Sequence, residues 1–198
     1  MKTITTKTKV FEFNELSATA QNNAIELNRD ININGDYWSD TTIEDFKEIG
    51  AKFGLDIDNI YFSGFWSQGD GACFTGNYEY KKGALKAIKK EYPNFIELHE
   101  IIELLQKEQK RFFYNVQTTI ENNGSNYSHE NSVTIDSYNS NTGDYMHESC
   151  TIGDTLRDFM RLIYTTLEKE YNCATNNDTI KECLINNEYD FLESGELY

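Results

Sequence analysis

The stretch IDNIYFSGFWSQGDGACFTGNYEY, residues 57–80, contains two runs rich in β-branched and aromatic residues with a glycine-rich segment between them. Such runs are typical of strands. Gly69 and Gly71 permit the positive φ angles of a tight turn, and the carboxylate of Asp70 can hydrogen-bond to the backbone beside it. The stretch therefore predicts a β-hairpin. Its predicted strands are residues 57–65 and 72–80.

The rest of the chain shows no regular alternation of strand and helix, which argues against a parallel sheet. In several segments apolar residues recur three and four positions apart, as in helices, and Ser17 occupies an N-cap position. We therefore expect residues 1–198 to form a single α+β domain, with a largely antiparallel sheet and several packed helices. Helices are expected from Ser17 and over residues 41–53, 81–92, 95–110, 154–171 and 175–187, and short strands over residues 9–13 and 188–195.

A second hairpin is predicted around Asn123-Gly124, where β-rich runs flank a dipeptide typical of reverse turns. The expected connection has two residues or slightly more. Gly124 is expected to have a positive φ angle.

The composition limits the classes of partner. The chain has 33 acidic and 18 basic residues, a formal net charge of −15. Such a field repels nucleic acid and anionic membranes, so neither is an expected direct partner. It suits a basic protein partner, or it serves solubility alone. Residues 81–111 nevertheless hold eight bases and five acids, so a nucleotide-sized anion can find local positive potential there.

Cysteine use indicates a reducing compartment. The four cysteines form no CxxC pair, and the first ten residues, MKTITTKTKV, lack the apolar segment of a signal peptide. We therefore expect four reduced thiols in a cytosolic protein. The cysteines are Cys73, Cys150, Cys173 and Cys183.

The first hairpin contains more than its turn requires. Gly64 and Gly76 fall inside the predicted strands, where glycine marks a bulge or a close approach of backbone or ligand. Trp66 stands at the loop edge, and tryptophan stacks on planar ligands as well as on core side chains. One interpretation is an aromatic cluster under a glycine turn. The other is a ligand cleft lined by Phe65, Trp66, Gln68 and Asp70.

A second polar segment resembles the first in kind. In INGDYWSD, residues 33–40, an expected loop, Tyr37 and Trp38 stand between two aspartates. Both tryptophans of the chain therefore occur in acid-flanked segments. This predicts that Tyr37 or Trp38 reaches the same ligand site as Trp66. The alternative is that Trp38 covers a pair of helices.

Two further groups carry possible chemistry. Cys73 can act as a nucleophile only with a base within hydrogen-bond reach, and the histidines are distant in sequence, so a satisfied, half-buried thiol with no chemical role is favoured. His129, His147 and Cys150 are suitable zinc ligands, but their spacing is only a weak match to a zinc site and no fourth ligand is evident. We therefore expect no metal, no cofactor and no catalytic residue.

Four segments of the chain, in order, resemble an uncharacterised group of bacteriophage-encoded proteins. They are VFEFNELSATAQNNAIE, YFSGFWSQGDGACFTG, ELHEIIELLQKEQ and NNEYDFLESGELY, of which FWSQGDGA is the most specific part. The resemblance spans almost the whole chain but implies no activity, so no catalytic residue is carried over. It implies a phage or prophage accessory protein in the cytoplasm of a bacterial host. Such proteins often counteract host defences.

Three functions follow as expectations. The first is a non-enzymatic protein that sequesters a small, planar, nucleotide-like ligand. The net charge opposes this unless basic residues such as Lys81, Lys82 or Arg111 line the site. The second is an acidic inhibitor that blocks a nucleic-acid-binding surface of a host defence protein. The third, a hydrolase acting through Asp70 or Cys73, ranks last because no paired base is evident.

Overall fold

The computed structural model describes all residues of the chain except 5, 6, 36, 125, 126 and 147–149. The described residues form two compact units. The central unit is Asp40–Glu168, and the terminal unit combines Met1–Ser39 with Lys169–Tyr198. The fold class is α+β, as expected, while the single domain over residues 1–198 stays a prediction. In the part of the chain that the structure describes, every helix is too short or too polar to cross a bilayer.

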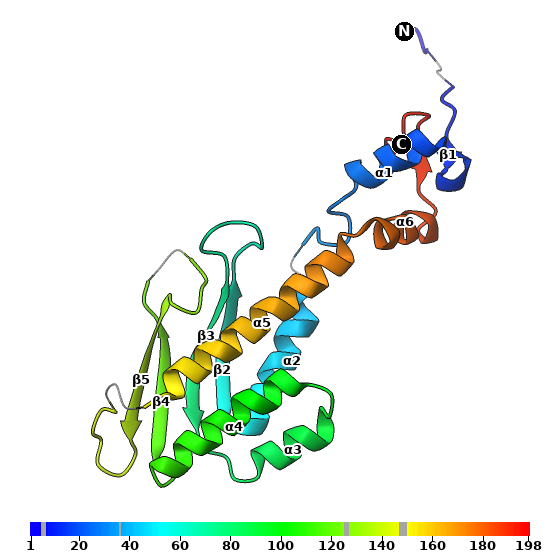
Figure 1. Ribbon diagram of the computed structural model, residues 1–198. Coiled ribbons are helices and arrows are strands. Elements are labelled where there is room, and N and C mark those ends of the chain that lie inside the picture. The colour runs from blue at the N-terminus through cyan, green and yellow to red at the C-terminus, as the bar shows by residue number, and fades with distance from the viewer. Residues whose placement is uncertain (5–6, 36, 125–126, 147–149) are drawn as a thin grey trace. The chain divides into compact units, whose positions relative to one another are not determined.

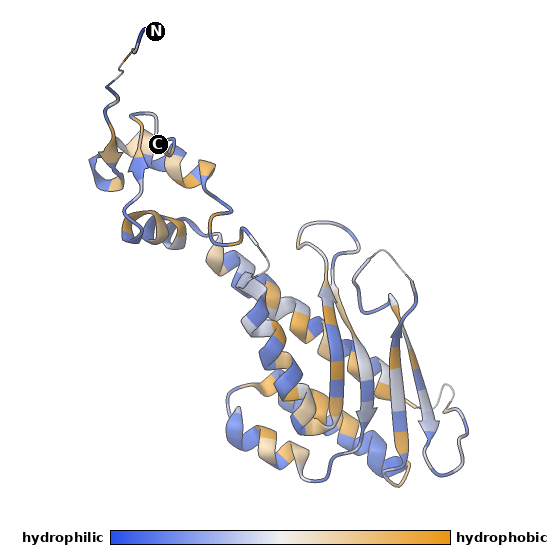
Figure 2. Ribbon diagram, turned by 180° about the vertical axis from the view of Figure 1, so that it is seen from behind, coloured by the Kyte–Doolittle hydropathy of each residue, from blue (hydrophilic) through white to orange (hydrophobic). Residues whose placement is uncertain are grey.

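The central unit is a sheet with helices packed on one of its faces (Figures 1 and 2). The sheet is antiparallel, with the strand order β2-β3-β4-β5. Its strands are β2 (Leu55–Phe62), β3 (Ala72–Glu79), β4 (Val116–Asn122) and β5 (Val133–Asn139). Its helices are α2 (Tyr37–Phe53), α3 (Ala84–Glu91), α4 (Ile96–Arg111) and α5 (Ile152–Ala174), of which α2 begins and α5 ends in the terminal unit.

Phe159 of α5 is at the centre of the core between the sheet and the helices. Its ring is fully buried and packs edge-on against Phe46 and Phe53 of α2, with centroid distances of 5.6 and 5.2 Å. It also packs against Phe74 of β3 at 6.0 Å. Because side chains alternate along a strand, Phe74 on the helix side places Cys73, Thr75, Asn77 and Glu79 on the opposite face. That opposite face is the open face of the sheet, toward the viewer in Figure 2.

Gly76 is required by the pairing of β2 with β3. A bulge interrupts their register between Ile57 and Asn59. At this point a Cβ atom on Gly76 would lie 2.0 Å from the carbonyl oxygen of Asp56, and Gly76 has a φ of +150°. The sequence reading of Gly76 as a bulge or close approach is therefore confirmed, and the approaching group is backbone.

The first hairpin is shorter in its strands than the sequence predicted. Strand β2 ends at Phe62, so Gly64 lies outside it, contrary to expectation. The chain bends here because the carboxylate of Asp70 binds backbone N–H groups of the loop, and Gly64 leaves room for that carboxylate. A Cβ atom on Gly64 would lie 3.3 Å from Asp70 Oδ2.

The second hairpin and the positive φ of Gly124 are confirmed, but the expected connection of two residues or slightly more is wrong. Strands β4 and β5 pair from Val116–Asn139 to Asn122–Val133, and Gly124 has a φ of +79°. The connection covers residues 123–132 in place of a tight turn. Ser132 explains part of this length, because its hydroxyl accepts a bond from the N–H of His129 and organises a second turn within the loop.

The terminal unit joins the two ends of the chain. Strand β1 (Phe11–Glu12) pairs antiparallel with β6 (Asp190–Phe191), and Ser17 caps α1 by accepting a bond from Ala20 N. The remaining elements are the 3-10 helix η1 (Phe13–Glu15), α1 (Ala18–Leu27) and α6 (Asn177–Asn186). Their core is the cluster Phe13, Leu16, Ala20, Ala24, Ile25, Ile180, Leu184 and Phe191.

Candidate functional site

The loop of the first hairpin is organised around Asp70. Its Oδ2 atom accepts hydrogen bonds from the backbone N–H groups of Trp66, at 2.9 Å, and Ser67, at 2.7 Å. The base of the loop is closed by a bond from Ser63 N to Gly71 O at 3.0 Å. Asp70 therefore holds the loop in shape, and its role in ligand binding stays a prediction.

The two aromatic residues of this loop have different environments. Phe65 is buried and packs against Phe62 and Tyr164, with centroid distances of 6.0 and 5.5 Å. Trp66 is 74% exposed. The loop thus combines both interpretations of its sequence, since Phe65 belongs to the core and Trp66 stands at the surface.

A second loop, residues 123–132, packs against the first at the same end of the sheet. Ser63 Oγ donates to the carbonyl oxygen of Ser128 at 3.2 Å, and a Cβ atom on Gly71 would lie 3.1 Å from the Cα of His129. A recess of about 320 Å³ lies between the loops. Its lining residues in the described chain are Gln68, Gly69, Asn123, Tyr127, His129, Asn131 and Ser132. Of the predicted ligand-binding residues, Gln68 lines this recess.

Cys73 lies beneath the second loop and is buried. Ser132 Oγ lies 3.6 Å from its sulfur. Burial raises the pKa of the Cys73 thiol above its ordinary value, which keeps the thiol protonated and weakens it as a nucleophile. The favoured interpretation of Cys73 as a thiol with no chemical role agrees with this environment, but the thiol is fully buried and not half-buried.

All four cysteines carry free thiols. His147 lies outside the described residues. Among the residues that are described, no group of three or more histidine, cysteine or carboxylate side chains is arranged to hold a metal ion.

Tyr37 and Trp38 belong to the terminal unit. They form the first turn of α2, so the expectation of a loop over residues 33–40 is wrong from Tyr37 onward. Trp38 packs edge-on against Tyr171 at 5.9 Å, and Tyr37 is 83% exposed. Helix α2 begins four residues before the predicted start because Trp38 gains this aromatic partner. A ligand site shared with Trp66 stays a prediction.

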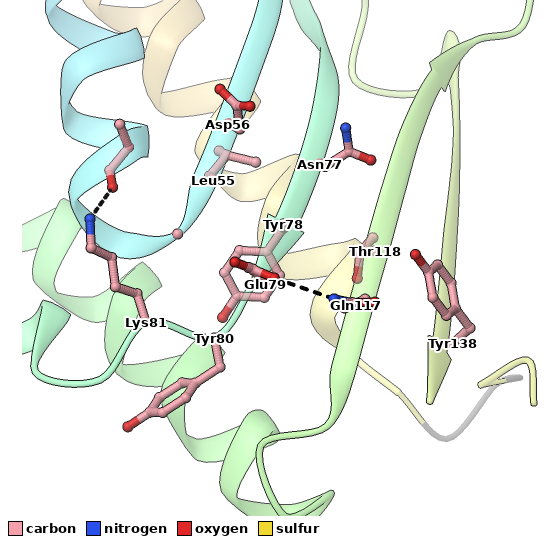
Figure 3. A pocket seen from close by; sticks show the side chains of 12 residues that line it. Leu55, Asp56, Asn77, Tyr78, Glu79, Tyr80, Lys81, Gln117, Thr118 and Tyr138 are labelled. Atoms are coloured by element: carbon pink, nitrogen blue, oxygen red, sulfur yellow. Dashed lines mark hydrogen bonds between the residues drawn. The ribbon is translucent and has the colours of Figure 1, made fainter. Parts of the chain in front are cut away.

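A cavity that the sequence did not predict lies on the open face of the sheet (Figure 3). Its volume is about 590 Å³, within the range of about 300–1,000 Å³ that small-molecule sites occupy. It lies wholly in the central unit. The lining residues are Ala51, Gly54, Leu55, Asp56, Asn77, Tyr78, Glu79, Tyr80, Lys81, Gln117, Thr118 and Tyr138.

Two rows of polar side chains form the floor of this sheet-face cavity. In the first row Asp56 of β2 pairs with Asn77 of β3. In the second, Glu79 of β3, Gln117 of β4 and Tyr138 of β5 pair across three strands. The rows are two residues apart along β3, or about 7 Å. Figure 3 shows the Asp56 and Asn77 side chains above Glu79 and Gln117, with Tyr138 at the β5 side.

Two hydrogen bonds hold three of the polar side chains at the cavity. Gln117 Nε2 donates to Glu79 Oε2 at 3.3 Å. At the α2 side, Lys81 Nζ donates to the carbonyl oxygen of Ala51 at 2.7 Å. An ammonium and a tyrosine ring thus stand at opposite sides of a floor that carries carboxylates and amides.

Tyr80 extends the cavity wall beyond the sheet. Its ring lies 4.3 Å from that of Tyr114, the residue that leads from α4 toward β4. Tyr114 and the preceding Phe113 both have positive φ angles, of 63° and 56°. Such angles are rare for aromatic residues, and the ring contact with Tyr80 helps to hold this segment in place.

Sequence reasoning missed the cavity because its residues come from separate segments that only the strand register brings together. One signal was present. Asn77, Glu79 and Lys81 are each two positions apart, which is the spacing of side chains on one face of a strand. This spacing predicts a polar strand face that ends next to a lysine. Lys81 is also one of the bases that the sequence named as a condition for binding a nucleotide-like ligand.

Comparison with known proteins identifies a family but no function. Neither the search of curated proteins nor the search of solved structures gave a significant match. The family model described as "Domain of unknown function (DUF8835)" matches residues 38–177, a region that includes the whole central unit and the sheet-face cavity. The chain therefore belongs to the DUF8835 family.

Proposed function

We propose that the protein binds and sequesters a small nucleotide-like ligand in the sheet-face cavity. The observation that carries the proposal is the presence of Lys81 and Tyr138 at opposite sides of a cavity of about 590 Å³. In a chain of net negative charge, a local cation favours the binding of an anionic ligand, and Lys81 supplies that cation at the cavity.

The chemistry of the lining suits a base and a sugar. A tyrosine ring offers a stacking surface for a planar base, worth about 1–3 kcal/mol in nucleic-acid complexes. The side-chain amides of Asn77 and Gln117 present both donors and acceptors to the polar edge of a base. The carboxylates of Asp56 and Glu79 accept hydrogen bonds from hydroxyl groups.

These groups favour binding over catalysis. The hydrogen bond from Gln117 to Glu79 fixes an acceptor and activates no nucleophile. The buried Cys73 thiol, with its raised pKa, is poorly suited to nucleophilic attack. The resemblance to bacteriophage proteins adds the biological setting, in which the protein acts in the host cytoplasm and counteracts a host defence by removing a signal.

Thermal unfolding with nucleosides and nucleotides tests the proposal. A ligand at 100 times its dissociation constant stabilises the folded protein by about 2.7 kcal/mol. We expect Asn77→Ala and Tyr138→Ala to lose this stabilisation and Trp66→Ala to keep it. The reverse pattern would place the ligand at the first hairpin loop, where the sequence predicted it. The same variants can be expressed in phage-infected cells. Asn77→Ala and Tyr138→Ala should then lose the protein's protective effect on the phage, and Trp66→Ala should keep it.

A second candidate function is supported by the composition of the sheet. Strands β2, β3, β4 and β5 contain no lysine, arginine or histidine. Their acidic residues are Asp56, Asp58, Glu79, Glu121 and Asp136. An acidic sheet of this kind suits contact with a basic, nucleic-acid-binding surface of a host defence protein.

Charge neutralisation away from the cavity separates the two candidates. Asp58, Glu121 and Asp136 do not line the cavity. If the protein is an acidic inhibitor, changing these three to amides abolishes salt-sensitive capture of a host protein. If it sequesters a ligand, the triple variant still binds the nucleotide that stabilises the wild type. The matched control neutralises three acids of the terminal unit, Glu182, Glu188 and Glu193.

A further inference from the structure

We infer that the ligand of the sheet-face cavity is a nucleoside monophosphate, in which one phosphate group faces Lys81 and the sugar hydroxyls face Asp56 and Glu79. This inference rests on the proposed function and narrows it. The observation behind it is the balance of charge, since two carboxylates and one ammonium line the cavity among the described residues.

The carboxylates define where hydroxyl groups bind. Asp56 and Glu79 stand in neighbouring rows, on adjacent strands, and both are exposed. Ionised carboxylates only accept hydrogen bonds, so they recognise hydroxyls and repel phosphate oxygens. A vicinal diol offers two donors at once. The same chemistry is used where an acidic residue binds the ribose of a dinucleotide.

Lys81 defines where a phosphate binds. Its Nζ atom is held by the carbonyl oxygen of Ala51. An ammonium carries three donor hydrogens, so a bond to a carbonyl still allows it to bind a phosphate. Lys81 follows Glu79 by two positions and stands at the α2 side of the cavity, while Tyr138 stands at the β5 side. A base stacked on Tyr138, a sugar over Glu79 and a phosphate at Lys81 therefore follow one line across the sheet.

Additional phosphates are disfavoured by the same balance. Each would add negative charge near Asp56 and Glu79, and Lys81 is the sole cation among the described lining residues. Repulsion between like charges in a partly desolvated site reaches the size of a tenfold change in affinity. We therefore expect each phosphate beyond the first to weaken binding by about tenfold.

Calorimetry with adenosine, AMP, ADP and ATP, and with the guanosine, cytidine and uridine series, tests this order. In the series that binds, the monophosphate should bind most tightly and the triphosphate most weakly. The matching 2′,3′-dideoxynucleoside should bind more weakly than the nucleoside. Lys81→Gln should reduce the affinity for the monophosphate to about that for the nucleoside. The affinity for the nucleoside should change little, because a nucleoside carries no phosphate for the exposed Lys81 to bind.

Neutralising the carboxylates should have the opposite effect on selectivity. Asp56→Asn with Glu79→Gln should bring the triphosphate affinity closer to that of the monophosphate. If the double variant does not fold, the single variant Asp56→Asn, at an exposed position, replaces it in the test. It should bring the two affinities closer in the same direction, by a smaller amount. Glu182→Gln in the terminal unit is the control and should leave all affinities unchanged.

The outcomes separate the inference from the function on which it rests. A triphosphate that binds as tightly as the monophosphate, or more tightly, overturns the inference and leaves the binding function standing. Equal affinity for nucleoside and monophosphate overturns the placement of the phosphate at Lys81. If no nucleoside or nucleotide of any series binds, the proposed function itself fails.

Discussion

Asp70 is the residue that gives the loop of the first hairpin its shape. The acid was predicted both to bond its own loop and to line a ligand cleft. Its Oδ2 atom bonds the N–H groups of Trp66 and Ser67, so the first role is confirmed. These two charge-assisted bonds orient the exposed Trp66 through its backbone. What Trp66 contacts in a complex therefore depends on Asp70 even if the carboxylate never touches a ligand.

The first prediction concerns the contribution of Asp70 to stability. We expect Asp70→Ala to lower the free energy of unfolding by about 1–3 kcal/mol, since two backbone N–H groups lose a charged acceptor. Asp70→Asn keeps an acceptor oxygen and should cost less. Urea unfolding of both variants measures the difference. Equal stability of wild type and Asp70→Ala would show that water replaces the carboxylate without loss.

The second prediction concerns Cys73 and pH. The folded pKa of this thiol is raised by burial, so the folded state holds the proton more tightly than the unfolded state does. Its contribution to stability is therefore complete below the unfolded pKa of about 8.5 and is lost as the pH rises through the folded pKa. In urea titrations, the fall in stability between about pH 8 and pH 10 should be smaller in Cys73→Ala than in wild type. Cys173→Ala, at an exposed position, should retain the wild-type fall.

At the scale of elements, local patterns predicted most helices and strands. The apolar stripes of residues 95–110 and 154–171 correspond to α4 and α5. They could be predicted because the spacing of apolar residues that indicates a helix lies within one continuous segment. Ser17 was recognised as an N-cap for the same reason. The early start of α2 was missed, since it depends on the contact of Trp38 with Tyr171, far away in sequence.

The sheet-face cavity could not be predicted in this way. It exists because Glu79 lies opposite Gln117, and Gln117 lies opposite Tyr138. A shift of one residue in either pairing would turn these side chains to the other face of the sheet. The register is set by packing of the whole sheet against Phe159 and its neighbours, and no short segment of sequence contains that information.

The third prediction tests the register of β2 and β3. We expect Gly76→Ala to cost about 3 kcal/mol or more, since its Cβ atom would meet the Asp56 carbonyl oxygen at 2.0 Å. Gly69→Ala is the matched control in the same hairpin, where φ is also positive but no atom lies within 4 Å of the Cβ position. It should cost only about 1 kcal/mol. Thermal or urea unfolding compares the two variants, and similar costs would contradict the close approach at Gly76.

At the scale of the whole molecule, the net charge of −15 acts on every ligand. A field of this sign lowers the local concentration of polyanions, so it strengthens the selection that the carboxylates of the cavity exert. It affects a triphosphate more than a monophosphate and a neutral nucleoside least. Selectivity for fewer phosphates therefore depends on the net charge of the whole chain as well as on the carboxylates of the cavity.

The last prediction follows from screening of that field. Raising NaCl from about 0.05 M to about 1 M shortens the Debye length from more than 10 Å to about 3 Å. The preference for a nucleoside monophosphate over the triphosphate should then decrease several-fold, because repulsion from distant carboxylates is screened. The preference for the monophosphate over the nucleoside should decrease as well, since screening also weakens the attraction to Lys81. Affinities of the neutral nucleoside serve as the control and should change little. A preference over the triphosphate that is independent of salt would mean that the cavity excludes the longer ligand by its shape and not by its charge.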